Sequence, residues 1–396
     1  MVDRVIQLQP LVRRFGVPAL VGMILLALFL DVVLRPEPIG VDFHTYAAAS
    51  LVGMQTGWAY IYDQNLVTYI QTQIPTRVWT QPFLSPPPVA WMVAPLMALP
   101  YAAAFFVWAL GILAAFIAAL WWSTDYRGRA RVIAVGATVA VWWVFSAVHV
   151  GQVAPLIAAG LLVAWRLLRE DKDFAAGIVL TVVLFKPNTA LLAPIALAFA
   201  GRFKAFVAWI AGSVVLVGVS LASLGPHGIE AYIVDLIDMP AQIRHSASLQ
   251  AIEGTFGLTG AGATALRVII VVAAMATAFR FRKSPWLAMV VGAMASLMTA
   301  SYLHPSDICL LVASGWILWH ERSDRVWRAL LVGLWFVALP FLRVVGLGVP
   351  LNRWLIIEMV FMVALILDAW MARPVISPQQ PRVFTPAADF GGPAPA

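Results

Sequence analysis

The sequence predicts an all-α polytopic membrane protein with about twelve transmembrane helices. Hydrophobic residues make up 62% of the chain and charged residues 11%, and the mean hydropathy is +0.88, which exceeds what the core of a soluble domain uses. Apolar stretches of about 17–25 residues, the length that one helix needs to cross the hydrocarbon layer, recur along nearly the whole chain. No soluble domain fits between them, so residues 1–372 are expected to form one membrane domain.

The first apolar stretch, Phe15 to Leu34, is predicted to be a retained span. It follows Arg13 and Arg14, but no small-residue cleavage site comes after it, as a secretory signal peptide would require. The other expected spans cover residues 101–122, 131–149, 151–168, 174–186, 188–200, 203–224, 262–280, 284–300, 305–320, 327–345 and 353–372.

The positions of arginine and lysine set the expected orientation. With an even number of spans both termini share one side, and most basic clusters then fall on that side, which the positive-inside rule makes cytoplasmic. These clusters are Arg4/Arg13/Arg14, Arg127/Arg129/Arg131, Arg166/Arg169/Lys172, Arg202/Lys204, Arg280/Arg282/Lys283, Arg322/Arg325/Arg328 and Arg373/Arg382. The opposite face receives two long loops, about 35–100 and 225–261. We therefore expect a multi-pass plasma-membrane protein whose sequence pI near 9.8 reflects orientation and not binding to nucleic acid.

Two other segments are not expected to span. Pro86 to Pro100 is apolar but short and rich in proline, so it is predicted to form a re-entrant or interfacial helix on the outer side. The Pro/Gly/Ala-rich segment 373–396 is predicted to be a disordered cytoplasmic tail. The single cysteine, Cys309, leaves no internal disulfide or multi-thiolate metal site. Because the outer loops also lack HxH and DxD patterns, we expect neither metal nor cofactor.

Polar residues that are hard to explain as lipid-facing side chains converge on the predicted outer face. They lie at separate turns and comprise Asp42 and Tyr46 in the first loop, Gln152 after Gly151, Lys186 before Pro187, and His304 before Pro305. Lys186 interrupts a long apolar run, and an ammonium near the bilayer centre costs roughly 2.5–3.5 kcal/mol on insertion scales. It either binds an anion such as a lipid phosphate or extends to the lipid head groups.

Each of the other polar residues has a structural alternative. A carboxylate such as Asp42, just beyond a span, serves either as a helix cap or, at a reacting hydroxyl, as a general base. His304 is either a hydrogen-bonded structural histidine or a site residue. Tyr62 belongs to a group of aromatic residues in the first outer region that either mark the membrane boundary or contact a sugar or an isoprenoid chain.

At these residues the chain resembles the GT-C superfamily of polytopic glycosyltransferases, and in particular glycosyltransferase family 87. The resemblance covers most of residues 15–320. Its motifs are Asp42-Phe43-His44-Thr45-Tyr46, Gly57-Trp58-Ala59-Tyr60-Ile61-Tyr62, Ser85-Pro86-Pro87-Pro88, Pro95-Leu96-Met97-Ala98-Leu99-Pro100, Gly151-Gln152-Val153, Ala176-Gly177, Lys186-Pro187 and Gly201-Arg202-Phe203-Lys204. The chain departs from the family pattern at Ala154, where Asn is frequent, and at Leu84-Ser85, where an aromatic residue often stands.

The resemblance implies an inverting hexosyltransferase of the mannosyltransferase type with GT-C-like outer loops. It implies a polyprenyl-phosphate-linked sugar, mannose in the family members considered, as donor and a glycolipid or glycan as acceptor, both at the outer face of the bilayer. Asp42 would be the catalytic base. Lys186, His304, Gln152, Tyr46 and Tyr62 would line the site for the donor phosphate and sugar.

Two other classes of function stay open at this point. A multi-span transporter or flippase for lipid-linked sugars also uses many spans, broken helices and intramembrane charges. Such a carrier is expected to place its coupling residues near mid-membrane and to show two related halves, whereas this sequence puts its polar residues at one face. A non-catalytic scaffold for envelope assembly would leave Lys186 and the outer polar residues unexplained.

Overall fold

The computed structural model describes residues 39–246, 252–340, 342 and 346–371. Within these ranges every regular element is a helix, and the predicted all-α fold is confirmed for this part of the chain. The predicted first span, 15–34, and the predicted tail, 373–396, lie outside the described residues.

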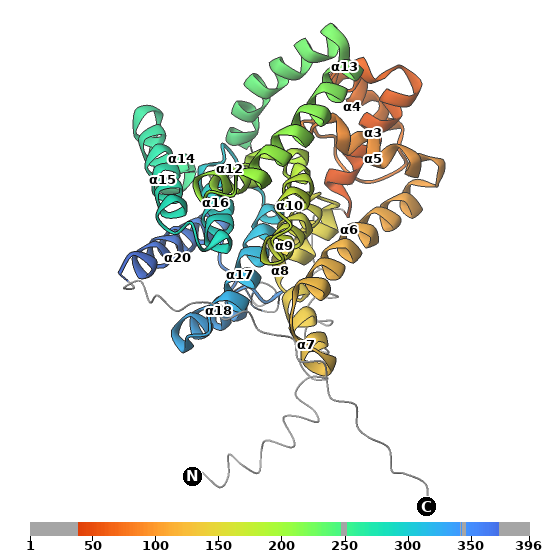
Figure 1. Cartoon of the computed structure of the whole chain (residues 1–396). Coiled ribbons are helices and arrows are strands. Elements are labelled where there is room, and N and C mark those ends of the chain that lie inside the picture. Colours follow the sequence, from red (N-terminus) through yellow and green to blue (C-terminus); the bar gives the residue numbers. More distant parts are fainter. Residues whose placement is uncertain (1–38, 247–251, 341, 343–345, 372–396) are drawn as a thin grey trace, which may run out of the picture.

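The chain after Gly40 forms a group of short helices at one end of the molecule (Figure 1). These are α3 (Val41–Gln55), η2 (Trp58–Tyr60), α4 (Gln64–Gln73), α5 (Pro87–Val93) and η3 (Ala94–Ala98). The proline-rich segment thus becomes two short helices, which together are too short to count as a span. The hydroxyl of Ser50 on α3 donates to the carbonyl of Ala90 on α5 at 2.7 Å, which joins this segment to α3.

Four helices in the described part of the chain are long and apolar enough to cross a membrane. They are α6 (Tyr101–Ser123), α13 (Phe203–Ser246) in its part Phe203–Ile237, α15 (Gly260–Arg280) and α20 (Leu351–Met371), of which Arg353–Met371 qualifies. A fifth results if α7 (Gly128–Val139) and α8 (Trp142–Val150), which meet at a bend of 63°, form one broken span. The predicted number of twelve spans is not supported.

The other predicted spans in the described part of the chain correspond to shorter helices, and turns divide some of these spans in two. The shorter helices are α9 (Ala154–Arg169), α10 (Asp173–Leu180), η4 (Thr181–Phe185), α11 (Pro187–Ala190), α12 (Leu192–Phe199), α16 (Pro285–Thr299), η5 (Pro305–Ile308), α17 (Cys309–Glu321) and α18 (Arg325–Val337). At Lys186 the backbone leaves the helical region (φ −152°, ψ 77°), and Pro187 starts the next helix, where its missing N–H costs nothing. Several of these helices, α9 and α16 above all, are buried among the others.

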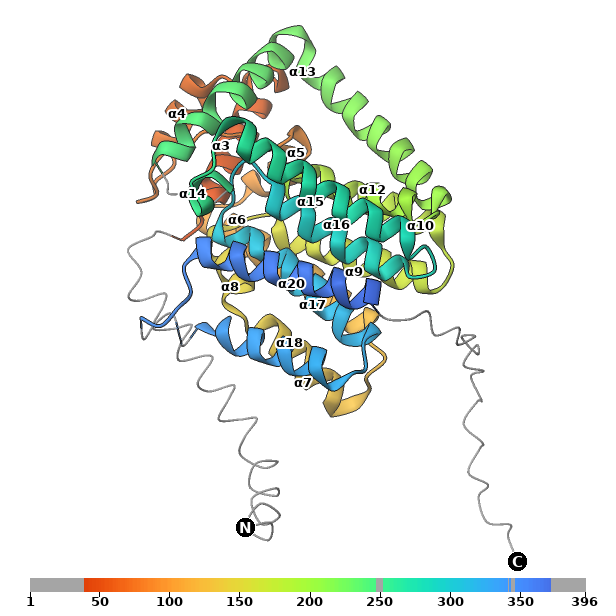
Figure 2. The same ribbon diagram turned by 90° about the vertical axis from the view of Figure 1, so that its left-hand side faces the viewer.

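The second outer loop, expected at 225–261, is largely helical. α13 bends at Gly225 (φ 60°, ψ −176°), a conformation that only glycine adopts readily, and then continues to Ser246. The short helix α14 (Ile252–Phe256) follows. Figures 1 and 2 show α13 rising to the end of the molecule that holds α3 and α4 and bending there. His227 contacts Tyr60 of η2, with 5.2 Å between the ring centroids.

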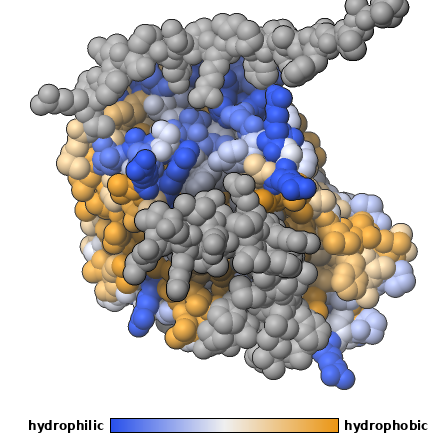
Figure 3. Space-filling view, turned by 90° about the horizontal axis from the view of Figure 1, so that it is seen from below, coloured by the Kyte–Doolittle hydropathy of each residue, from blue (hydrophilic) through white to orange (hydrophobic). Residues whose placement is uncertain are grey.

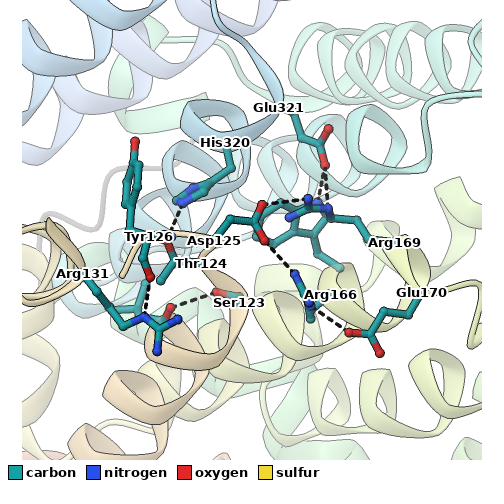
Figure 4. A network of polar contacts seen from close by, with 12 residues as sticks. Ser123, Thr124, Asp125, Tyr126, Arg131, Arg166, Arg169, Glu170, His320 and Glu321 are labelled. Atoms are coloured by element: carbon teal, nitrogen blue, oxygen red, sulfur yellow. Dashed lines mark hydrogen bonds and ion pairs between the residues drawn. The ribbon is translucent and has the colours of Figure 1, made fainter. Parts of the chain in front are cut away.

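Charged residues gather at the other end of the bundle, where Figure 3 shows hydrophilic side chains within a hydrophobic surround. Arg166 and Arg169 of α9 form ion pairs with Asp125, just after α6, at 3.0 and 2.9 Å (Figure 4). Glu321 at the end of α17 accepts a hydrogen bond from the Trp165 indole at 2.8 Å. This network clamps α6, α9 and α17 together. At about 1.5 Å per residue, the 23 residues of α6 separate this charged network from α3 by about 34 Å.

Candidate functional site

Close contact between two turns places Asp42. Gly151 ends α8 in the left-handed region (φ 77°), and a Cβ there would lie 2.7 Å from the Cβ of Phe43. Glycine therefore lets the first turn of α3 approach the turn between α8 and α9. The Gly40 N–H donates to the carbonyl of His149 at 2.8 Å, and the Trp108 indole of α6 donates to that of Gly151 at 2.8 Å. These contacts bring Asp42 beside Gln152.

The side chains of Asp42, Gln152 and Tyr46 form one hydrogen-bonded chain. Tyr46 and Asp42 lie one helical turn apart on the same face of α3. The Tyr46 hydroxyl donates to Gln152 Oε1 at 2.7 Å, and the N–H of Val153 donates to the same oxygen at 2.9 Å. These two donors orient the amide, so that Gln152 Nε2 donates to Asp42 Oδ2 at 2.8 Å. Asp42 Oδ1 has no hydrogen bond with a described residue.

The surroundings of Asp42 raise its pKa to about 6. Burial is the largest cause, because a desolvated carboxylate loses hydration, and the Asp307 carboxylate adds to the increase. The Lys186 charge and the hydrogen bond from Gln152 lower the pKa and offset part of that increase. A carboxyl group with this pKa is mostly ionised at neutral pH, yet it is a stronger base than an exposed aspartate.

Lys186 forms a buried ion pair with Asp307. Its Nζ donates to Asp307 Oδ1 at 2.5 Å, and the exposed fractions of the two residues are 8% and 0%. Burial alone would lower the pKa of Lys186, but Asp307, Tyr302 and Asp42 together hold it above the usual value. The ammonium is therefore charged. Only one of its three N–H groups is used in this pair, which leaves two for a ligand.

Asp307 also organises the turn that carries His304. Asp307 Oδ2 accepts the backbone N–H of His304 at 2.9 Å, so one carboxylate holds both the ammonium and the turn. Burial and the nearby Lys186 charge lower the pKa of His304 to about 4, although the Asp307 carboxylate acts in the opposite direction. The imidazole is therefore neutral at neutral pH. It can accept one hydrogen bond and donate another, but it does not supply a positive charge.

Tyr302 and Tyr232 extend this cluster. Tyr302 lies against His304, with 5.8 Å between their rings, and it interacts electrostatically with Asp42, Lys186 and Asp307. Tyr232, on the second part of α13, interacts electrostatically with Tyr302 and contacts Tyr62 at 4.5 Å between ring centroids. Tyr302, Tyr232 and Tyr62 thus connect α13 with the cluster around Asp42.

Tyr62 has a structural role beside this cluster. Its ring is stacked on Phe83 at 5.5 Å between centroids, and its hydroxyl donates to the carbonyl of Ser85 at 2.8 Å. It is almost fully buried, with 2% of its surface exposed. Beside it, the amide of Gln64 donates to Asp235 of α13. The hydroxyl of Tyr62 is thus already used by the protein.

The structure brings five of the six residues singled out in the sequence into one cluster, and two others complete it. Asp42, Tyr46, Gln152, Lys186 and His304 meet through direct contacts or electrostatic interactions. Asp307 and Tyr302 had been given no role. An isolated lysine in an apolar run calls for an anionic partner, and a carboxylate such as that of Asp307 meets this need as well as a phosphate does. Nothing in the sequence around Tyr302 marks it as part of the cluster.

The described residues include no group of three or more His, Cys, Asp or Glu side chains that could hold a metal ion. The two carboxylates of the cluster have partners within the protein, since Asp42 accepts a hydrogen bond from Gln152 and Asp307 pairs with Lys186. Independence from metal stays a prediction.

Comparison with known proteins assigns a family. No curated protein and no solved structure matches the chain significantly. The family model of glycosyltransferase family 87 matches residues 83–305, which is more than half of the chain. The matched range includes Gln152, Lys186 and His304, whereas Asp42 precedes it and Asp307 follows it. The chain belongs to glycosyltransferase family 87.

Proposed function

We propose that this glycosyltransferase moves mannose from a polyprenyl-phosphate donor to a hydroxyl of a glycolipid or glycan acceptor. The reaction takes place at the extracytoplasmic face of the plasma membrane and inverts the configuration of the transferred sugar. Family membership supports sugar transfer and disfavours the alternative of a transporter. The observation that carries the proposal is a carboxyl group with one oxygen unbonded by any described residue, in the same cluster as a buried, charged ammonium.

Asp42 is the general base in this reaction. Its free Oδ1 takes the proton of the acceptor hydroxyl, while Gln152 holds Oδ2. The acceptor oxygen forms a bond to the anomeric carbon, and the bond from that carbon to the phosphate oxygen breaks, with its electron pair leaving on the phosphate. A direct displacement of this kind inverts the anomeric centre, because the nucleophile attacks opposite the leaving group.

Lys186 stabilises the leaving phosphate. Negative charge grows on the phosphate oxygen as the bond breaks, and an ammonium already fixed by Asp307 needs little reorganisation to meet it. An interaction that strengthens in the transition state raises kcat rather than only tightening donor binding. His304 is neutral and suits a hydrogen bond to a sugar hydroxyl.

The test uses purified protein, radiolabelled polyprenyl-phosphate mannose and extracted membrane lipids. Wild-type protein is expected to transfer label to a new glycolipid, and Asp42→Asn is expected to lose at least about 100-fold in rate, since base catalysis contributes this much or more. Asp42→Asn should fold normally, because an amide can still accept from Gln152. Asp63→Asn is the matched control, since Asp63 caps α4 through two backbone N–H groups and asparagine caps helices as well.

Each failure has a separate meaning. Full activity of Asp42→Asn would exclude Asp42 as the base. Labelled mannose that crosses the bilayer of proteoliposomes without entering a new product would support a carrier and exclude the transfer reaction.

A further inference from the structure

A large apolar cavity lies beside the candidate site, and none of the side chains of that site lines it. Its volume is about 680 Å³, and its walls come from α7, α8, α16, α17, α18 and α20, with Ile308 of η5 among the lining residues. It extends along α17 from Ile308 to Trp319 and reaches Tyr126 before α7. At 1.5 Å per residue, this path along the helix is about 16 Å long. Ile308 follows Asp307, so the cavity begins next to the cluster around Asp42 but is lined by different residues.

One carboxyl group is buried in this apolar wall without a partner. Glu358 of α20 has 2% of its surface exposed, and neither of its carboxyl oxygens has a hydrogen bond within the described part of the chain. A buried carboxyl group without a partner is unfavourable whether it is ionised or protonated. Such a group needs an explanation in a native structure, and a bound molecule that completes its hydrogen bonds is one.

An indole N–H on the facing helix is also unpaired. Trp143 of α8 has 3% of its surface exposed, and its Nε1 has no acceptor among the described residues. Its ring packs edge-on against Trp354 at 5.2 Å, and Trp354 lies one helical turn before Glu358. The unpaired donor and the unpaired carboxyl group therefore belong to one region of the cavity.

Other tryptophans of the same wall have partners within the protein. Trp316 donates to Ser123 Oγ at 3.0 Å, Trp319 to the Tyr126 hydroxyl at 2.8 Å and Trp335 to the carbonyl of Ala137 at 2.7 Å. These three indoles thus have partners within the protein. Among the described residues, the buried Glu358 carboxyl and the buried Trp143 indole have none, and both residues line the same cavity.

We propose that this cavity binds a lipid alcohol, a molecule with one hydroxyl group on a long apolar chain. A hydroxyl can accept the Trp143 N–H and at the same time donate to Glu358, and it can bond to the carboxyl group in either protonation state. The chain fills the space along α17, where the lining is apolar. A hydrocarbon or isoprenoid chain without a polar group would leave both atoms unpaired.

The test measures binding to the purified full-length protein in detergent, without donor or acceptor, so its result is independent of the proposed function. The probes are a tritiated long-chain primary alcohol and the tritiated alkane of the same length. Wild-type protein is expected to bind the alcohol saturably and at least tenfold more tightly than the alkane. Glu358→Leu should bind the two probes equally, and Trp143→Phe should lose several-fold for the alcohol only.

Thr138→Val is the matched control. Thr138 lines the same cavity, but its hydroxyl donates to Ala134 within α7, so the substitution should leave alcohol binding unchanged. Equal affinity of wild-type protein for alcohol and alkane, or no saturable binding, would overturn the proposal. So would a loss in Thr138→Val as large as that in Glu358→Leu. If Glu358→Leu does not fold, the affinities of wild-type protein and Trp143→Phe for the alcohol are compared. Equal affinities would then overturn the proposal.

Discussion

Gln152 determines how Asp42 can act, because its amide occupies one carboxylate oxygen and leaves the other free. The amide cannot rotate without losing both the Tyr46 hydroxyl and the Val153 N–H. In the proposed mechanism, the base is therefore held in one orientation before any substrate arrives. The proposal then makes the protonation state of Asp42 the variable that sets the rate.

The rate should therefore depend on pH through Asp42. The pKa of Asp42 is about 6, so its carboxylate becomes protonated as pH falls through that value. A protonated carboxyl group cannot take the proton of the acceptor hydroxyl. We expect kcat/KM to be level above about pH 7 and to be roughly tenfold lower near pH 5. A profile measured at constant donor saturation checks this. Activity that stays level down to pH 5 would rule out a base with this pKa.

The Lys186–Asp307 pair should show strong coupling between its two partners. Asp307→Asn leaves a buried ammonium without its counter-ion, which is expected to cost about 3–5 kcal/mol of stability. Lys186→Met combined with Asp307→Leu removes both charges and should restore most of that stability, but not the transfer activity. Thermal unfolding in detergent and the transfer assay, run on both single variants and the double variant, measure the coupling. If the loss of stability in the double variant equalled the sum of the losses in the two single variants, the expected coupling would be absent.

At the scale of elements, the turn between α8 and α9 positions the site. Gly151→Ala adds a methyl group 2.7 Å from the Cβ of Phe43 and places alanine at φ 77°. We expect α3 to shift, with the protein still folded. Because a displacement of about 1 Å can cost about 100-fold in rate, transfer should fall by one to two orders of magnitude. Gly218→Ala is the control, since nothing lies within 4 Å of its added Cβ. A Gly151→Ala enzyme with normal kcat would show that α3 is not held by this contact.

Local sequence signals predict some of these elements and miss others. The break at Lys186 could be predicted, because a charge followed by proline within an apolar run is incompatible with a continuous buried helix. The second part of α13 was expected to be a loop, because its composition is polar and Gly225 and Pro226 interrupt the pattern. The helix there packs on η2, where Gly228 approaches the carbonyl of Ala59. A contact between segments so far apart in the chain leaves no local pattern.

The same distinction applies to the site. Asp42 and Lys186 could be found because each stands out against its apolar neighbours. The pairing of Lys186 with Asp307 joins residues 121 positions apart, so it depends on how the helices assemble. Tyr302 is ordinary in sequence and becomes part of the site only through its neighbours in space.

For the whole molecule, the count of spans was the weakest prediction. Hydropathy finds apolar segments, but it does not separate a helix that faces lipid from a short helix buried among others, such as α16. The arrangement of the two ends is clearer. The candidate site lies at the start of α6, and the clamp around Asp125 lies at its end.

Thiol labelling tests the orientation of these two ends. In a Cys309→Ala background, Ile39→Cys places a thiol at a position with 44% of its surface exposed next to the site, and Lys172→Cys places one at the opposite end, where 59% of the side chain is exposed. A membrane-impermeant reagent applied to intact cells should label the first variant only. Labelling of the second should require permeabilised cells. The reverse pattern would place the site in the cytoplasm.

The ion pair between Lys186 and Asp307 also has a consequence for biosynthesis. The ribosome completes Lys186 well before Asp307, so the nascent chain carries a lysine whose counter-ion has not yet been made. Until the turn after α16 enters the bilayer, that ammonium must stay in contact with water or with the insertion machinery. A chain truncated before residue 307 keeps this cation without its counter-ion permanently.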